Sequence, residues 1–354
     1  MTPFSVITFL VIIAVIVLAH ELGHFVTARA SGVKVEEFGI GFPPRLFSIK
    51  RGGTVYSLNA IPLGGFTKMA GEEDPKVTGS LASKSAGARL LVLSAGSIMN
   101  LLLPILLFSI AFMVPHDLVI EPVRIEEVAP GSPADKAGIE SGDIILSVDT
   151  KPVNNLNDVH RYIQLKLGME TTLLIQHTDS TTEEIRLIPR WRHPQDEGAI
   201  GVKLDPEYAQ LNQSTTREHY PFWEAIPLAI GSSLETLVLF KNDIVGMIIG
   251  AVPLAVTGPL GIAQIAGEVA RSGISPLMEF AAFISINLGV VNLFPLPALD
   301  GGRMVFVLLE LLRRGKRISP KTEGVVHLVG FVLLIALILL VTYQDILRIM
   351  AGGS

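Results

Sequence analysis

Four long apolar windows, of which all but the first are free of formal charges, constrain the fold of this chain more than any other feature of its sequence. They run from Met1 to Ala28, interrupted only by His20, Glu21 and His24, and over Leu90–His116, Phe280–Leu299 and Gly324–Gln344. Each is about as long as the 20 residues that a helix needs to cross a membrane. Only 17% of the 354 residues are charged, against about 25% in a soluble domain. The sequence therefore predicts a multi-pass α-helical membrane protein with four transmembrane helices.

The charges between these windows predict an orientation. The loop 29–89 carries nine Lys or Arg against five acids, and the turn 303–323 is also basic, whereas segment 117–276 holds 12 basic and 22 acidic residues. Cytoplasmic loops carry the excess of Lys and Arg, so both basic loops are expected on the cytoplasmic side and the acidic segment outside. No Lys or Arg precedes the first window and no small-residue cleavage site closes it, so we expect a retained helix and not a signal peptide.

A further apolar stretch complicates the count of spans. Pro221–Val252 is apolar but interrupted by Glu224, Glu235, Lys241 and Asp243. We interpret it as helices that lie at the membrane surface or cap the core. The alternative is a fifth span, which would put the two basic loops on opposite sides of the membrane.

Residues 120–205 have the pattern of a separate module. Alternating apolar runs predict strands at Val123–Val128, Ile144–Val148, Thr171–Gln176 and Glu184–Ile188, and one helix is expected around Leu156–Leu167. The run Ala129-Pro-Gly-Ser-Pro-Ala-Asp-Lys-Ala-Gly138 followed by Gly142-Asp143 resembles the PDZ domains of bacterial proteases. Such domains bind extended peptides by strand addition. The alternative is a small β domain with only a steric role.

The chemistry-bearing motif is His20-Glu21-Leu-Gly-His24 at the end of the first window. Two His at i and i+4 project from one face of a helix and suit two bonds to one zinc ion. Glu21 stays near that face and can take a proton from zinc-bound water. Placing an ionisable residue inside an apolar span costs free energy, so such residues usually indicate a functional site. The alternative is that these side chains only hydrogen-bond other helices.

A third ligand must come from elsewhere, and because the chain has no cysteine it must be a His or a carboxylate. His116, His160, His177, His193 and His219 fall in the outer segment, and His327 is isolated at the start of the fourth window. Asp300 is the stronger candidate, as the only acid at the inner end of the third window. Pro295 and Pro297 break the helix before it, and broken backbone at membrane depth needs a protein pocket around it.

His20-Glu-x-x-His24 together with Asn292-Leu-Phe-Pro-Leu-Pro-Ala-Leu-Asp300-Gly resembles the site-2 protease family of intramembrane zinc metalloproteases, and the module after the second window narrows this to its bacterial RseP/RasP-like group. Further matches are Phe38-Gly-Ile-Gly-Phe42, Ile61-Pro-Leu-Gly-Gly-Phe66-x-Lys-Met69 and Gly258-Pro-Leu-Gly-Ile-Ala263. The family's G-P-x-x-N element is present as Gly96-Ser-Ile-Met-Asn100, with Ser97 in place of proline.

The resemblance implies roles for single residues. His20, His24 and Asp300 would bind one Zn²⁺ and Glu21 would be the general base. Asn292 would assist through hydrogen bonds to the substrate or the oxyanion, or alternatively only cap the broken backbone. Contacts with substrate are expected at Gly64, Gly65, Asn100 and Pro297. The region Thr54–Met69 would be a membrane-entering β element that pairs with unwound substrate; the alternative is an ordinary cytoplasmic hairpin.

The predicted organisation follows from these assignments. It comprises a first transmembrane helix (1–28), a cytoplasmic or membrane-entering β region (29–89), a second helix (90–116), a PDZ domain (120–205), an outer linker with interfacial helices (206–276), a third transmembrane segment (277–302), a basic helix or loop (303–323) and a fourth helix (324–346).

By resemblance, the chain is expected to be an intramembrane zinc endopeptidase of the bacterial inner membrane. Its partners would be the lipid bilayer, transmembrane substrates such as trimmed anti-sigma factors or remnant signal peptides, and a peptide or trimmed substrate end at the PDZ domain. A net charge of −5 gives no reason to expect nucleic-acid binding. Two rivals are an ion transporter that uses the His and Asp residues, and an inactive PDZ scaffold. Tightly held stoichiometric zinc would exclude the transporter.

Overall fold

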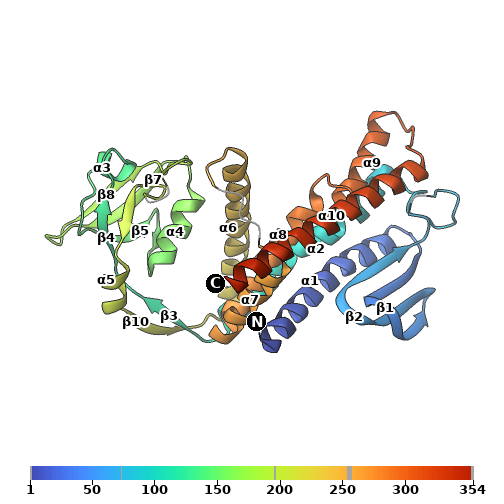
Figure 1. Ribbon diagram of the computed structural model, residues 1–354, viewed down its shortest axis with the longest axis horizontal. Coiled ribbons are helices and arrows are strands. Elements are labelled where there is room, and N and C mark those ends of the chain that lie inside the picture. The colour runs from blue at the N-terminus through green and yellow to red at the C-terminus, as the bar shows by residue number, and fades with distance from the viewer. Residues whose placement is uncertain (1, 73, 195–196, 253–256, 352–354) are drawn as a thin grey trace. The chain divides into compact units, whose positions relative to one another are not determined.

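The computed structural model describes residues 2–72, 74–194, 197–252 and 257–351, and the chain forms two compact units (Figure 1). The first unit comprises Met1–Ala111, Phe222–Ser233 and Val256–Ser354, and the second comprises Phe112–Pro221 and Leu234–Ala255. The first unit contains α1 (Pro3–Ala30), β1 (Val35–Arg51), β2 (Thr54–Met69), α2 (Ala86–Met113), α7 (Pro259–Ser272), α8 (Ile274–Leu293), α9 (Asp300–Leu312) and α10 (Pro320–Met350). Helix α6 (Phe222–Ile248) belongs in part to each unit.

Five helices of the described residues are long and apolar enough to cross a membrane: α1, α2, α6, α8 and α10. The four predicted windows fall in α1, α2, α8 and α10. Helix α8 ends at Leu293, before its window does, because Pro295 and Pro297 cannot continue it. The fifth is α6, which is one continuous helix of 27 residues although Pro227 lies inside it. The sequence analysis expected helices here that lie at the membrane surface or cap the core.

Helix α1 packs against β1, β2, α7 and α8 in the first unit, and glycines let α7 and α2 approach it closely. Thr2 caps its first turn by accepting the Ser5 N–H. Near this end, Gly267 of α7 lies so close to Ser5 that a side chain there would collide with it. Farther along, Gly23 faces the Ala95 backbone of α2 in the same way. Small residues let helices approach closely where lipid supplies no hydrophobic driving force.

Strands β1 and β2 form an antiparallel sheet beside the second half of α1 (Figure 1). Both strands bend, so that β1 residues 37–40 pair on one side with 55–58 and on the other with 65–68, while 45–51 pairs with 54–59. The sheet thus has four segments, and residues 65–69 form one of its edges. The β1–β2 turn uses Gly52 and Gly53, both at positive φ, where glycine carries no steric penalty.

The far end of α10 is tied to α7 through a buried carboxylate. Asp345 is 3% exposed, and its oxygens accept the backbone N–H groups of Gly258 and Gly261 at 3.2 and 2.9 Å. A carboxylate at a helix N-terminus satisfies free N–H groups and complements the helix dipole. The two glycines of the Gly258-Pro-Leu-Gly motif make room at this contact, because a Cβ on Gly258 would collide with Asp345 and a Cβ on Gly261 would collide with the side chains of Thr257 and Arg348.

The second unit is built on a six-stranded antiparallel sheet. Its strands are β4 (Val123–Val128), β5 (Ile144–Val148), β6 (Lys151–Pro152), β7 (Thr171–Gln176), β8 (Thr182–Leu187) and β9 (Val202–Leu204), in the order β8-β7-β5-β4-β9 with β6 beside β5. Strands β3 (His116–Ile120) and β10 (Ser214–Glu218) form a separate two-stranded ribbon. Short helices α3 (Pro133–Lys136), α4 (Leu156–Leu165) and α5 (Pro206–Leu211) complete the unit.

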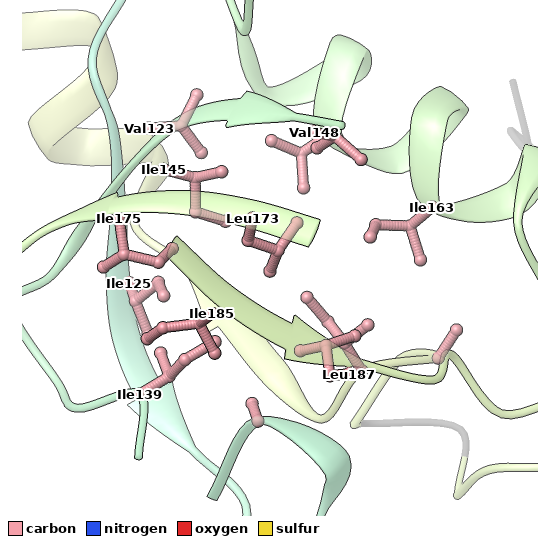
Figure 2. Packing of buried hydrophobic residues seen from close by; sticks show 14 of the residues in the cluster. Val123, Ile125, Ile139, Ile145, Val148, Ile163, Leu173, Ile175, Ile185 and Leu187 are labelled. Atoms are coloured by element: carbon pink, nitrogen blue, oxygen red, sulfur yellow. The ribbon is translucent and has the colours of Figure 1, made fainter. Parts of the chain in front are cut away.

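Branched aliphatic residues from alternating positions fill the core of this unit (Figure 2). Ile125, Leu173 and Ile175 are completely buried between the strands, and Ile163 reaches them from α4. The predicted strands at Val123–Val128, Ile144–Val148 and Thr171–Gln176 are found with the same bounds, and the fourth and the helix are found within a few residues.

The second half of α6 is part of this unit and contacts the rest of it through polar groups. Glu235 forms ion pairs with Lys151 and with Arg161 of α4. Two turns further along α6, the Asn242 amide donates to the Gln164 carbonyl at 2.7 Å. This half of the helix is therefore a partner of the α4 surface.

Candidate metal centre

The motif residues His20 and His24 lie one turn apart on α1 and are buried against α2. Their Nε2 atoms are 3.1 Å apart. The i, i+4 spacing on a helix places both rings on one face, as the sequence predicted. The two imidazoles are thus already aimed at one point.

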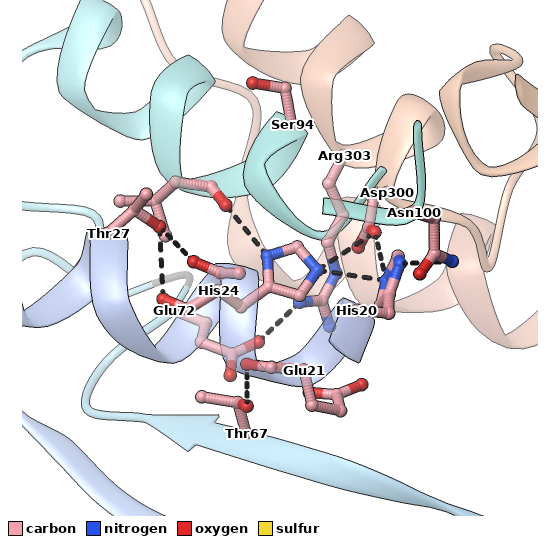
Figure 3. Close-up of polar contacts among 12 residues, drawn as sticks. His20, Glu21, His24, Thr27, Thr67, Glu72, Ser94, Asn100, Asp300 and Arg303 are labelled. Atoms are coloured by element: carbon pink, nitrogen blue, oxygen red, sulfur yellow. Dashed lines mark hydrogen bonds and ion pairs between the residues drawn. The ribbon is translucent and has the colours of Figure 1, made fainter. Parts of the chain in front are cut away.

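Asp300 reaches the same point from the first turn of α9, 276 residues beyond His24 (Figure 3). One carboxylate oxygen, Oδ2, lies 3.0 Å from His20 Nε2 and 3.1 Å from His24 Nε2. The described residues contain one group of three or more His, Asp or Glu that could hold a metal ion, and it is this one, with its ligand atoms within 4.8 Å of one another. The ligands of a tetrahedral zinc with bonds of 2.0–2.1 Å lie about 3.3 Å apart.

The loop before Asp300 is shaped so that α9 can begin at this residue. Gly301 and Gly302 lie directly under the backbone of the loop, and a side chain at either would collide with the carbonyls of Leu293, Phe294 or Leu296. From the other side, Arg303 pairs with Glu72 at 2.6 Å (Figure 3). The glycines after Asp300 therefore serve close packing of the loop that presents the carboxylate.

Both imidazoles are oriented by groups behind them. His24 Nδ1 lies 2.8 Å from the Val92 carbonyl of α2, so it carries the proton and donates it there, which leaves Nε2 free to bind a metal. His20 Nδ1 lies 3.4 Å from the Asn100 amide nitrogen, while Asn100 Oδ1 is buried without a hydrogen-bond partner in the described part of the chain. The side chain of Asn occupies the same space with its amide oxygen and nitrogen exchanged. Rotating it places Oδ1 on His20 Nδ1–H, which satisfies that oxygen and gives His20 the metal-binding tautomer.

Gly96 of α2 leaves the space in which a metal ion fits. A Cβ on this residue would lie 2.6 Å from His20 Nε2 and closer still to His24 Nε2. Gly96 and Asn100 open and close the motif Gly96-Ser-Ile-Met-Asn100, so the motif provides both the space and the support of one ligand. The sequence analysis recognised this motif but assigned Gly96 no role.

The donor set suits a catalytic zinc site. Two neutral imidazoles and one carboxylate hold zinc with a fourth position left for water, whereas structural sites close all four positions with protein ligands. Burial of the His side chains at 10% and 7% exposure keeps competing solvent away from these ligands.

Glu21 lies on the side of α1 that faces β2 (Figure 3). The Thr67 hydroxyl donates to the Glu21 carbonyl at 3.0 Å. A Cβ on Gly65 would lie 3.4 Å from Glu21 Cγ and 2.8 Å from the Gly39 carbonyl. The edge segment of the β1–β2 sheet therefore runs next to the motif, and the glycine at position 65 relieves a collision with Gly39 inside the sheet.

The remaining predicted site residues lie around this centre. Asn292 occupies the last turn of α8 and is half-buried. Pro297 packs against Gly330 of α10, and Gly64, at a φ of +119°, lies against Val17 of α1. Asn100 is completely buried, so the structure gives it a contact with His20. Their predicted contacts with substrate stay predictions.

Comparison with known proteins agrees with the resemblance seen in the sequence. The family model described as Peptidase family M50 matches residues 8–337. A protein of Clostridium acetobutylicum, provisionally named a zinc metalloprotease, is 35% identical over 98% of each chain. A protein of Geobacillus kaustophilus named zinc metalloprotease RasP is 30% identical over 97% of each chain. One of Oceanobacillus iheyensis with the same name is 27% identical over 98% of this chain and 99% of its own.

Proposed function

This chain belongs to peptidase family M50, the site-2 protease family, and from that premise we propose how its residues act and what it cleaves. It is an intramembrane zinc metalloprotease, with Zn²⁺ as its cofactor. The observation that carries the assignment of residues is the convergence of His20, His24 and Asp300 from α1 and α9.

His20, His24 and Asp300 hold the Zn²⁺ ion, each through one of the atoms that converge in the structure. A Zn²⁺ ion held there would supply polarisation of the peptide carbonyl and would lower the pKa of the attacking water to about 7. The Val92 carbonyl and the Asn100 amide keep the two imidazoles in the tautomer that binds metal.

Glu21 accepts the proton of the attacking water and delivers it to the leaving amine. Its place in the motif, one residue after His20 and three before His24, keeps it next to the ligands. Asn292, near the end of α8, donates a hydrogen bond to the substrate or to the developing oxyanion.

The edge of the β1–β2 sheet receives the substrate as an added strand. A helical substrate engages its carbonyls in internal hydrogen bonds, so it must unwind before its peptide bond is accessible. Residues 65–69 are paired on one side only, and Thr67 holds this edge against the Glu21 backbone. Strand addition would supply the unwound backbone with new partners beside the metal ligands.

Four of the apolar helices span the membrane, and α6 lies at its outer surface. The support is the polar contact of α6 with α4 in the second unit through Glu235 and Asn242, since charged side chains cost less free energy in contact with water than in the hydrocarbon core. The distribution of basic residues places the metal centre towards the cytoplasm and the second unit outside. The chain then resides in the bacterial inner membrane.

The second unit is a PDZ domain that selects substrates, as a docking site or as a size filter. Strand β9 lies at one end of its sheet order, which is the kind of edge that PDZ domains offer to a peptide. The substrates are single-pass transmembrane proteins whose outer part has been removed, such as anti-sigma factors, or remnant signal peptides.

Glu21→Gln tests the chemistry directly. In purified full-length protein, we expect the variant to keep one zinc per chain and to cleave a transmembrane peptide about 10²–10⁴-fold more slowly, since this is what general-base catalysis contributes. Glu268→Gln, an exposed carboxylate on α7, is the matched control and should cleave normally. Full proteolysis by Glu21→Gln with zinc retained would refute the proposed base.

A further inference from the structure

The loop that carries Asp300 has a backbone conformation that needs support from outside. Ala298, two residues before Asp300, has a φ of +77°. This left-handed region is disfavoured for a residue with a Cβ, and it persists only where surrounding contacts enforce it. The position of the Asp300 carboxylate thus depends on whatever enforces this conformation.

Helix α10 supplies that support through His327. The Ala298 N–H donates to His327 Nδ1 at 3.0 Å. Nδ1 is therefore the unprotonated nitrogen of the ring, and the proton sits on Nε2. This hydrogen bond acts on the residue in the left-handed conformation itself.

Gly330, one turn further along α10, provides a second contact for the loop before Asp300. A Cβ on Gly330 would lie 2.8 Å from the Pro297 carbonyl oxygen, so only glycine lets Pro297 rest against the helix. His327 and Gly330 are three residues apart and share a helix face. Together they hold Pro297 and Ala298, which lead directly into the metal-ligand turn.

The other side of the imidazole is apolar. Its ring packs against Phe306 of α9 with 5.5 Å between centroids, and Nε2 is buried without a hydrogen-bond partner among the described residues. The hydrogen bond to Ala298 is thus the polar contact through which this side chain acts. His327 was the histidine that sequence analysis weighed as a third ligand, and the structure directs it at the loop instead.

We propose that His327 is a positioning residue: by accepting the Ala298 N–H it fixes the left-handed turn that places Asp300 between His20 and His24. This inference rests on the zinc site of the proposed function. Helix α10 contributes none of the three proposed ligands, but through His327 it would determine the position of the third ligand, Asp300.

The test compares three variants of the full-length protein, with affinity measured by chelator competition and geometry by the visible spectrum of the Co²⁺-substituted protein. Loss of an outer-shell partner weakens metal binding about 10–100-fold. We expect that loss and an altered cobalt spectrum for His327→Leu. His327→Asn places an amide oxygen near the position of Nδ1, and it should bind zinc within about threefold of wild type. Leu328→Ala, at an exposed neighbour, should change neither quantity.

Two outcomes would overturn the proposal: wild-type affinity and spectrum for His327→Leu, or an Asn variant as weak as the Leu variant. If His327→Leu does not fold, His327→Gln decides, because its oxygen lies near the Nε2 position and should fail where Asn succeeds. Equal behaviour of Asn and Gln would then refute the role of Nδ1. If the wild-type protein bound neither Zn²⁺ nor Co²⁺, the proposed zinc site itself would be refuted. If all variants bound metal normally, only the proposed role of His327 would be refuted.

Discussion

The two units of this molecule are stabilised in different ways. The second unit is held by a core of branched aliphatic side chains from alternating strand positions, such as Leu173 and Ile175. The metal centre of the first unit is held by close backbone approaches at glycines, such as Gly23 and Gly96, and by single hydrogen bonds to ligands. A substitution in the aliphatic core of the second unit should therefore lower stability. A substitution at the metal centre of the first unit should abolish function with little loss of stability.

The sharpest test of this contrast is Gly96→Val. Its side chain would occupy the space beside His20 Nε2 and His24 Nε2, so zinc affinity should fall by about 100-fold or more and cleavage should be lost. Gly87→Ala is the control on the same helix, because a Cβ there has no neighbour within 4 Å. Zinc content by elemental analysis and hydrogen exchange of the second unit are the two measurements. A variant that still holds stoichiometric zinc would show that Gly96 does not border the site.

The converse change is Leu173→Ala in the core of the second unit. Leu173 is completely buried, and buried Leu→Ala changes cost about 2–5 kcal/mol. We expect a loss of about 3 kcal/mol in the free energy of opening of β7, measured by hydrogen exchange in the full chain, with zinc affinity unchanged. Leu211→Ala, at a residue 77% exposed, should leave both unchanged. The contrast between the units would fail if Leu173→Ala weakened zinc binding as strongly as it weakened the sheet.

The same difference explains which parts of the fold the sequence could predict. Strands β4, β5 and β7 were found at the predicted bounds because a strand with one buried face repeats with a local period of two. Strands β3 and β10 were missed, since their pairing of residues such as Asp117 with Arg217 joins segments about 100 residues apart and leaves no local pattern. Strand β1 lies inside the predicted β region 29–89, but no strand was predicted at its own residues, because Gly39 and Gly41 weaken the strand signal.

At the metal centre, the sequence could predict the residue types but not their supports. His20 and His24 follow from a helical spacing, and Asp300 followed from being the one acid beside broken backbone. The space at Gly96 and the Val92 carbonyl depend on how α2 packs on α1, which no local pattern encodes. The length of α6 was unexpected because charged residues interrupt its apolar pattern, whereas Glu235 is satisfied by Lys151 and Arg161.

The smallest expected effect is a pH dependence confined to the second unit. His177 Nδ1 lies 3.0 Å from the buried Asp143 carboxylate, and this hydrogen bond raises the pKa of His177 above its usual value. A raised folded-state pKa contributes stability that is fully present below the unfolded value of about 6.5 and is lost as the pH rises through the folded value.

Hydrogen exchange of β5 and β7 should therefore quicken, after correction for intrinsic rates, as the pH is raised from about 6 through the raised pKa. His177→Gln should flatten this dependence, while His219→Gln, at an exposed histidine of the same unit, should preserve it. Zinc affinity needs its own correction, because metal binding is pH-dependent through its ligands; once corrected, it should not differ between the two variants. An equal pH response in His177→Gln and wild type would show that the Asp143 contact contributes nothing to the second unit, and that its stability rests on the aliphatic core alone.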